Sequence, residues 1–464
     1  MMRRRSVCAV TLAAGALLSA CMSLAPEYER PSAPVAPAFP GEPVGSGPAA
    51  SDIDWQSFYT DERSRRLIQL ALQHNRDLRV AALTIEQARA QLQVRRADAL
   101  PTVNAIAAGS REPGSNGSQA SLYTIGLGVT AWELDFFGRI RSLSDVALAQ
   151  FYATEEARKA AQIALIAAVV NAQLALAADD ELIEATRRTL ATREDSLKLT
   201  KLKFDNGAAS ELDLRQAESL LEGANVALAQ QKRQRALDEN ALVLLIGQPL
   251  PSDLPPARPL AEQGLLGQLP PGLPSDLLDR RPDVRQAERQ LIGANANIGA
   301  ARAAFWPRIT LTGTVGIAST ELSKLFSDGS SAWTFAPQLV LPIFDAGRNR
   351  ANLQVAEVNR DIAVAQYERA IQTAFREVAD ALAGRATLGE QLRAQQAQAQ
   401  AEEVRSRLAD LRYRNGAASY LDVLDAQRSL FAARQAVVQV QLQQAQNLVT
   451  LYKVLGGGWT DPMK

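Results

Sequence analysis

Chemically reactive side chains are scarce in this chain. Its 464 residues include two cysteines and a single histidine, His74. A structural zinc site needs about four cysteine or histidine ligands, and no such cluster occurs with the spacing of a metal site. A Ser-His-Asp triad would depend on His74, which lies in a polar segment and is expected at the surface. With no phosphate-binding glycine loop either, the composition argues against an enzyme and against any cofactor.

Excess charge and aromatic residues are also lacking. Lys+Arg and Asp+Glu number 50 each, and aromatic residues make up 5% of the chain. A balanced charge provides no attraction to a polyanion, so we expect no nucleic-acid partner. Hydrophobic residues make up 47% and are concentrated in long Ala-, Leu- and Gln-rich stretches, which are typical of long helices.

The first residues resemble an export signal. A basic start at Arg3–Arg5 precedes an apolar run and the sequence Leu18-Ser-Ala-Cys21. This pattern predicts a secretory signal, residues 1–20, ending in a bacterial lipobox, with Cys21 as the lipid-attached N-terminus. The alternative is an ordinary signal peptide that carries these four residues by chance. Because Cys8 lies in the segment to be removed, no disulfide is expected within the mature chain.

Residues 21–50 contain seven prolines between Pro26 and Pro48. Proline-rich segments are extended and semi-rigid. We therefore expect an N-terminal tether rather than a domain.

One short turn sequence occurs twice, as Asn206-Gly207-Ala-Ala-Ser210 and Asn415-Gly416-Ala-Ala-Ser419. Asn-Gly tolerates a positive φ and ends a helix, and the serine caps the next one. Each turn is therefore predicted to be the tip of a hairpin of two long helices.

Other pairs of residues recur at nearly the same separation. Pro101 and Pro307 are 206 residues apart, whereas Gly138 and Gly347 are 209 residues apart. The chain is thus predicted to hold two internal repeats. They are residues 51–247 and 283–458, joined by a proline-rich connector at 248–282 in the equatorial region and followed by a short tail at 459–464.

Each repeat is expected to contain one β-hairpin, at about 102–132 and 308–343. Apolar residues such as Ile309 and Leu311 alternate there with threonine or glycine, which is the period of a strand. Segments of about ten residues match strands that cross an outer membrane. Four strands cannot close a barrel, and open strand edges are not tolerated in lipid. Other copies must complete the barrel; two copies would give eight strands and three would give twelve.

Long helices should follow each hairpin. The helical pattern runs from Gly138 to about Lys203 and from Gly347 to about Arg412, or on the order of 100 Å each. The returning helices are about half as long. The apolar stretch Ala160–Ala178 could alternatively cross a membrane, but polar residues interrupt it, and its place in the motif series favours a water-exposed helical domain.

Two carboxylates follow the second turn. Asp422 and Asp425, three residues apart, share one helix face, and Leu421 precedes them. One interpretation is a solvated first turn in which acidic residues favour the helix dipole. The other is a gate, because copies around an axis would turn these residues into acidic rings and an apolar constriction.

A series of motifs, in order along the chain, carries a family resemblance. The motifs are Asn75-Arg-Asp-Leu78, Trp132-Glu-Leu-Asp-Phe-Phe-Gly-Arg139, Arg281-Pro-Asp-Val284, Pro342-Ile-Phe-Asp-Ala-Gly-Arg348, Tyr413-Arg-Asn-Gly-Ala-Ala-Ser-Tyr-Leu-Asp-Val-Leu-Asp-Ala-Gln427 and Leu455-Gly-Gly-Gly-Trp459. Together they resemble the TolC-type outer-membrane efflux factors over nearly the whole mature chain. Cys21 places the chain closer to the OprM-like lipoprotein branch.

The resemblance implies a mixed α/β membrane protein. It implies a homotrimer with a 12-stranded transmembrane β-barrel, four strands per chain, continued by a long periplasmic α-helical barrel. Such a protein is a passive duct for drugs or other small toxic compounds. Its implied partners are outer-membrane lipid, a periplasmic adaptor (a membrane fusion protein) and an inner-membrane transporter of the resistance-nodulation-division (RND) class.

By the same resemblance, Leu421 and Asp425 match the positions that close the periplasmic end, and Asp422 is expected to join them. The tips at Asn206, Gly207, Asn415 and Gly416 would meet the adaptor. Since only the second repeat carries the carboxylate pair, we expect the gate on the second tip. The first tip should serve docking and support.

Two other functions remain open from the residues. A type I protein-secretion duct would share the fold and differ in its partner, so a neighbouring gene for an ATP-driven exporter would favour it. A soluble periplasmic coiled-coil scaffold would lack the strand alternation and would stay out of membranes.

Overall fold

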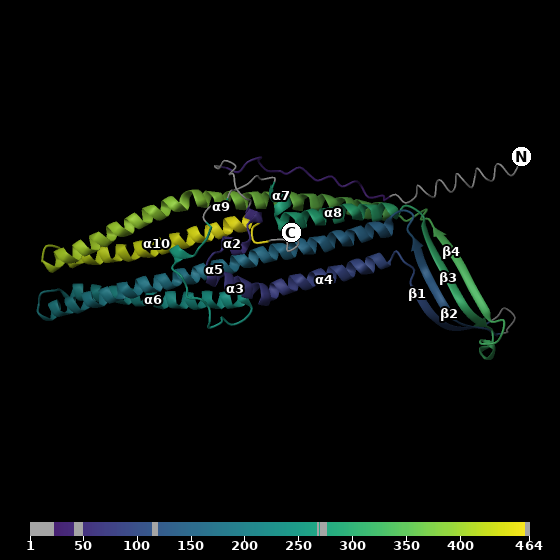
Figure 1. Cartoon of the computed structure of the whole chain (residues 1–464), viewed down its shortest axis with the longest axis horizontal. Helices are drawn as coiled ribbons and strands as arrows, with labels where there is room; N and C mark the ends of the chain where they lie inside the picture. The colour runs from purple at the N-terminus through teal and green to yellow at the C-terminus, as the bar shows by residue number, and fades with distance from the viewer. Residues whose placement is uncertain (1–22, 41–49, 114–118, 267–268, 270–275, 460–464) are drawn as a thin grey trace. The chain divides into compact units, whose positions relative to one another are not determined.

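The computed structural model describes residues 23–40, 50–113, 119–266, 269 and 276–459 (Figure 1). The predicted signal and Cys21 lie outside the described residues, so lipid attachment stays a prediction. The chain divides into two compact units. We call them the sheet unit (Leu83–Glu156, Arg285–Arg369 and the N-terminal residues to Ser32) and the helical unit (Ala33–Ala82, Ala157–Val284 and Ala370–Lys464).

From α4 onward, the long elements form the same series in each half of the chain. In order they are α3 (Glu62–His74), α4 (Arg76–Ala97), β1 (Val103–Pro113), β2 (Gln119–Leu134), α5 (Arg139–Asp205), α6 (Glu211–Ile246), α8 (Pro282–Ala303), β3 (Arg308–Ser319), β4 (Ser331–Val340), α9 (Arg348–Arg414) and α10 (Tyr420–Val454). The short elements are η1 (Ala50–Asp52), α2 (Trp55–Phe58), η2 (Leu260–Glu262), α7 (Asp276–Arg280) and η3 (Leu322–Lys324).

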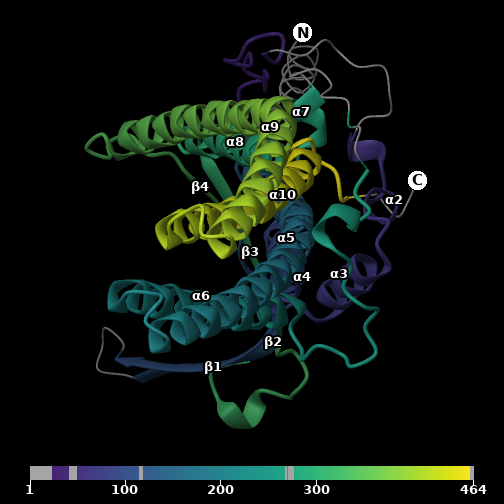
Figure 2. The same ribbon diagram turned by 90° about the vertical axis from the view of Figure 1, so that its left-hand side faces the viewer.

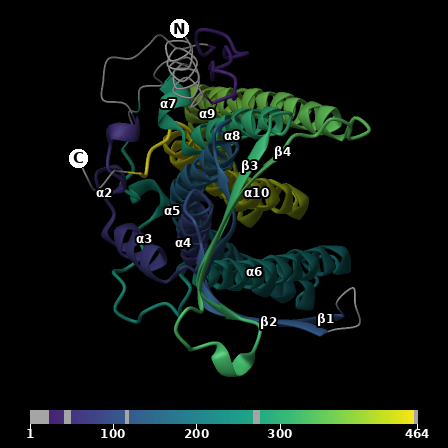
Figure 3. The same cartoon turned by 90° about the vertical axis from the view of Figure 1, so that its right-hand side faces the viewer.

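The four strands form one antiparallel sheet in the order β1-β2-β3-β4 (Figure 3). Leu127 pairs with Val315, and the register shifts by one residue between Val129 and Trp132. Side chains alternate between the two faces of a sheet, so the apolar residues found in the alternating pattern share one face. Among the residues that the structure describes, one edge of β1 and one edge of β4 have no strand partner.

Two glycines allow close approach at the middle of the sheet. Gly126 of β2 pairs with Gly316 of β3. A Cβ atom on Gly316 would lie 2.5 Å from the Cα atom of Gly126 and closer still to the carbonyl oxygen of Ile125. Only glycine avoids these clashes without a shift of the backbone.

The long helices have matched lengths. Helices α5 and α9 have 67 residues each, whereas the returning helices α6 and α10 have 36 and 35. Figure 2 shows α5 beside α6 and α9 beside α10 as two hairpins. The returning helices therefore cover about half of each long helix, as the sequence predicted.

Helix α5 contains the apolar stretch that could alternatively cross a membrane. Among the described residues it is the only helix long and apolar enough by length and composition, and 56% of its apolar window is buried within the chain. Ile166, Val169, Val170 and Leu174 are each at most 2% exposed. The stretch thus packs as the core of a helical unit.

The N-terminal segment docks on α8. Residues 23–40 contain no helix or strand. Asn295 Nδ2 donates to the carbonyl oxygen of Pro26 at 2.8 Å, and the guanidinium of Arg30 donates to both oxygens of Glu288 at 2.6 and 3.0 Å. The predicted tether is therefore irregular in structure, and Pro26 and Arg30 fix its first part to the sheet unit.

Candidate functional site: the hairpin tips

The two predicted tips are closed by the same backbone geometry. Gly207 and Gly416 have φ values of 72° and 75°, in the left-handed region that only glycine adopts without strain. The amide groups of Asn206 and Asn415 each donate to a backbone carbonyl four residues earlier, at 2.7 Å. The asparagines thus cap the outgoing helices, and both glycines have open space within 4 Å of a built Cβ atom.

A capping box begins each returning helix. Ser210 caps α6 with Asp213, and Ser419 caps α10 with Asp422. Asp422 accepts hydrogen bonds from the backbone N–H of Ser419 at 3.2 Å and from its hydroxyl at 3.0 Å. The structure therefore gives Asp422 a local role in starting its helix, which the gate interpretation did not include.

The other predicted gate residues have different surroundings. Asp425 forms an ion pair with Arg405 of α9, which also binds Glu402 at 3.0 Å. This pair joins the two helices of the second hairpin, and both side chains are about half exposed. Leu421 is 62% exposed, so it is available to a surface outside this chain.

An apolar cluster joins the two hairpins near the tips. Tyr420, Val423 and Leu424 of α10 are buried with Ala217 of α6. The Tyr420 hydroxyl lies 2.9 Å from the Ser196 hydroxyl of α5. The second tip is therefore held against the first hairpin within one chain.

Cluster residues were not predicted as site residues, although one sequence signal pointed to them. Tyr420 and Leu424 of the second repeat are replaced by Glu211 and Arg215 in the first. The latter two are exposed and form an ion pair at 3.3 Å. The replacement leaves α6 without the large apolar side chains that α10 buries in this cluster, to which α6 contributes Ala217.

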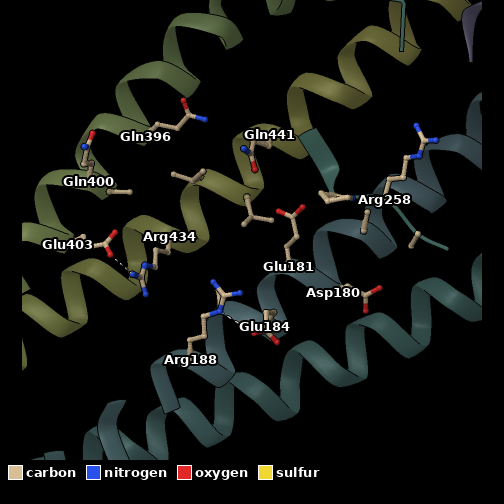
Figure 4. A pocket seen from close by; sticks show the side chains of 17 residues that line it. Asp180, Glu181, Glu184, Arg188, Arg258, Gln396, Gln400, Glu403, Arg434 and Gln441 are labelled. Carbon is tan, nitrogen blue, oxygen red and sulfur yellow. Dashed lines mark hydrogen bonds and ion pairs between the residues drawn. The ribbon is translucent and has the colours of Figure 1, made fainter. Parts of the chain in front are cut away.

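One pocket of the helical unit has a volume of about 720 Å³. Figure 4 shows Glu403 facing Arg434 and Glu184 facing Arg188. Arg188 binds Glu184 at 3.1 Å and Arg434 binds Glu403 at 3.3 Å, while Glu181 accepts from the Leu260 backbone. Because these charges are paired, the cavity offers no free carboxylate set, and the described residues include no cluster able to hold a metal.

One buried carboxyl group in the helical unit has a displaced pKa. The pKa of Asp179 is raised from about 3.8 to about 7. Burial is the larger cause, and the neighbouring carboxyl of Asp238 is the second. Arg235 does not neutralise Asp179, since that guanidinium binds Asp180 at 2.6 Å. Asp179 and Asp238 lie on α5 and α6, so this pair joins the two helices of the first hairpin.

Asp179 should make the protein less stable as the pH rises. Its folded pKa lies above its unfolded value, so the folded state binds more protons between about pH 4 and 7, and the free energy of unfolding falls across this window. Asp179→Asn is expected to flatten this fall and to raise the midpoint of thermal unfolding at pH 8 relative to the native chain. Asp195→Asn, at an exposed position of α5, is the control. A native midpoint that rises from pH 5 to pH 8 would contradict the assignment.

Comparison with known proteins decides the family. A family model described as outer membrane efflux protein matches residues 67–248 and 273–457. The chain belongs to the outer membrane efflux protein family. This efflux protein is 46% identical over 463 residues to the probable efflux pump outer membrane protein TtgC of Pseudomonas putida, covering 97% of this chain and 95% of that one. It is 46% identical over 452 residues to outer membrane protein OprJ of Pseudomonas aeruginosa, covering 96% and 94%.

Solved structures agree with this family. A membrane protein from Pseudomonas aeruginosa is 45% identical, with a TM-score of 0.87 over 94% of this chain and all of that one. The open state of the MtrE outer membrane channel of Neisseria gonorrhoeae is 41% identical, with a TM-score of 0.87 over 94% of this chain and 98% of that one. The efflux protein therefore has the fold of TolC-like outer-membrane channels, mostly helical with a small sheet.

Membership of this family also establishes what kind of protein the chain is and in which membrane it lies. The chain is an outer-membrane channel of tripartite efflux pumps, located in the outer membrane with a periplasmic extension. Its family is one of channels rather than of enzymes.

Proposed function

We propose that three copies of this chain form a passive duct that carries small toxic compounds from an RND pump and its periplasmic adaptor to the outside. The single observation that carries the assembly is the sheet, whose β1 and β4 each leave one edge unpaired. Such edges cannot face lipid. Three copies supply twelve strands, and the two long helical hairpins of each copy extend the duct into the periplasm. The relatives named as antibiotic and toluene efflux pump proteins support this class of cargo.

The gate of the duct is assigned to Leu421, Asp422 and Asp425 on the second tip. The ion pair between Asp425 and Arg405 holds α10 against α9. A half-exposed pair contributes at most about 1 kcal/mol, so docking of a partner can break it at little cost. Cys21 is assigned to lipid attachment in the outer membrane.

The turns at Asn206-Gly207 and Asn415-Gly416 are assigned to adaptor docking. Both glycines have open space around a built Cβ atom, so a large side chain there leaves the fold intact apart from backbone strain of about 1–2 kcal/mol. It would project toward an incoming partner. The proposal therefore predicts that tip variants lose adaptor binding while they still assemble.

Capture of the adaptor of the same efflux system tests this function. Gly207→Arg and Gly416→Arg together are expected to reduce the amount of adaptor captured by the purified channel roughly tenfold or more. Gly223→Arg provides the matched control, because Gly223 also has open space but lies within α6. Equal capture by the tip variant and the native chain would remove the tips from docking. Capture of an ATP-driven exporter's adaptor instead would indicate a protein-secretion duct.

A further inference from the structure

The contact that closes the ring can be derived from a contact inside one chain. Helices α4 and α8 have 22 residues each and begin 206 positions apart, at Arg76 and Pro282. Helices α5 and α9 have 67 residues each and begin 209 positions apart, at Arg139 and Arg348. If the halves are equivalent units, β3 corresponds to β1 and β4 to β2. The β2–β3 pairing within the chain then corresponds to pairing of β4 with β1 of the next copy.

Strand registers fix the numbering of this equivalence. Val103 pairs with Val129, and 206 positions later Ile309 pairs with Leu339. Residues of β4 therefore lie 210 positions after their counterparts in β2. The helices that follow these strands are only 209 positions apart, so the segment from Val129 to the start of α5 is one residue longer than the segment from Leu339 to the start of α9. The extra residue accounts for the register shift between Val129 and Trp132.

We propose that β4 pairs with β1 of the next copy with Leu339 opposite Ala107, in one unbroken antiparallel register. The pair Val129–Gly313 maps onto Leu339 and Ala107. Beyond the shift, the pair Trp132–Leu311 maps onto Leu341 and Ala105. The pairs derived from either side of the β2–β3 register shift agree. From Leu339 to Leu341 the chain advances two residues, and from Ala107 to Ala105 it goes back two residues, as an antiparallel pairing requires. This inference rests on the proposed oligomer and adds which residues meet at its seam.

Side-chain size supports the pairing. The register places the apolar face of β4 beside the corresponding face of β1. On β4 this face carries large exposed residues, namely Leu339, Phe335 and Trp333 at 62%, 63% and 75% exposure. In this register Leu339 lies opposite Ala107 and Pro337 lies opposite Gly109, whereas Phe335 lies opposite Arg111. A large side chain thus overlies a small one at Leu339, an arrangement that packs well.

The helices next to the sheet point to the same seam. Within the chain, α5 packs against α8, where a Cβ atom on Gly293 would lie 3.3 Å from the Cβ atom of Ala149. Ala149 and Ala153 are 4% and 1% exposed. Their counterparts on α9, Val358 and Ile362, are larger and yet 47% and 49% exposed.

Helix α4 shows the complementary difference. Ala300 of α8 is 9% exposed, whereas its counterpart Val94 of α4 is 63% exposed. Valine and isoleucine rarely stand in such exposed stripes without a partner. The α5–α8 contact therefore recurs as a contact of α9 with α4 of the next copy.

The approach of Ala149 to Gly293 identifies one pair of residues that meet in this second contact. The Ala149–Gly293 approach maps onto Val358 of α9 and Gln87 of α4. Gln87 is exposed within the chain, and its long, flexible side chain can turn aside to admit a neighbouring helix. Cysteine is smaller than either residue, so this pair is suited to cross-linking.

Disulfide trapping in the outer membrane tests the register. Opposed residues in an antiparallel pair have Cα atoms about 4.5–5.5 Å apart, within reach of a disulfide. Leu339→Cys combined with Ala107→Cys is expected to convert most of the monomer band into multi-chain species on oxidation. Within one chain the same positions lie at opposite edges of the sheet, about 14 Å apart across the strands. Leu339 also lies eight residues along β4 from Ser331, which shares a row with Ala107, so the two cysteines should not link internally. Each single variant should yield no ladder.

Matched pairs make the result specific. Leu339→Cys with Val103→Cys is displaced by four residues, about 13 Å along the strand, and should not link. In the helices, Val358→Cys with Gln87→Cys should link, whereas Val358→Cys with Val94→Cys, about 10 Å away along the axis, should not. This second pair keeps the test valid if cysteines in the strands disturb the barrel.

The possible failures are distinguishable. Linking of the displaced strand pair in place of the Leu339–Ala107 pair would overturn the register while leaving the oligomer intact. Absence of any oligomer on unheated gels before oxidation would overturn the proposed assembly together with the register. If the oligomer is intact but neither the Leu339–Ala107 pair nor the Val358–Gln87 pair links, the contact between neighbouring copies is not equivalent to the contact between the two repeats within one chain.

Discussion

Asp425→Ala is expected to raise the single-channel conductance of the purified protein severalfold in planar lipid bilayers. The substitution removes the carboxylate that binds Arg405 and so frees α10 from α9 at the second tip. It also removes the predicted ring of negative charge, so the preference for cations should fall. Addition of Asp422→Ala should increase conductance further, because Asp422 also forms the capping box with Ser419, worth about 1 kcal/mol.

Asp410→Ala is the matched control for the gate. Asp410 lies on α9 near the same tip and forms an ion pair with Arg414 at 2.8 Å, but it does not join two helices. The single-channel conductance of the Asp410→Ala variant should equal that of the native chain. Unchanged conductance and selectivity in Asp425→Ala and in the double variant would remove both carboxylates from the gate.

Gly316→Ala is expected to abolish assembled channel in the outer membrane. The added methyl group would clash with backbone atoms of Ile125 and Gly126 in the neighbouring strand, and backbone atoms cannot rotate away as a side chain can. A clash of this kind costs about 3 kcal/mol or more per copy, which changes the folding equilibrium by more than about a hundredfold. Heat-resistant oligomer on unheated gels measures the effect.

A neighbouring glycine in the same strand provides the control. The nearest atom to a Cβ atom on Gly313 is the carbonyl oxygen of Thr334 at 3.5 Å, an ordinary contact. Gly313→Ala should therefore assemble like the native chain. Normal assembly of Gly316→Ala would show that the β2–β3 pairing is wrong at this position.

Local patterns in the sequence predicted the elements well. The Asn-Gly turns with their serine caps and the alternation of Ile309 and Leu311 each depend on residues close together in the chain, and β3 and both tips occur there. Pro337 lies within β4, although proline has no backbone N–H to donate to a neighbouring strand.

Contacts across the helices could not be predicted in the same way. The ion pair of Arg405 with Asp425 spans 20 residues, and the contact of Ser196 with Tyr420 spans 224. The raised pKa of Asp179 depends on Asp238, which lies 59 positions later on another helix. These pairings depend on which faces of long helices meet, and periodicity alone leaves that choice open.

Export of a fluorescent pump substrate from living cells tests the central claim most directly. A strain lacking this chain, but retaining the adaptor and pump of the same system, should accumulate the compound. Expression of the native chain should restore its export, whereas Gly316→Ala should not. Equal export rates with and without the native chain, when the protein is present as an oligomer in the outer membrane, would contradict the proposal that the chain is the duct of that pump.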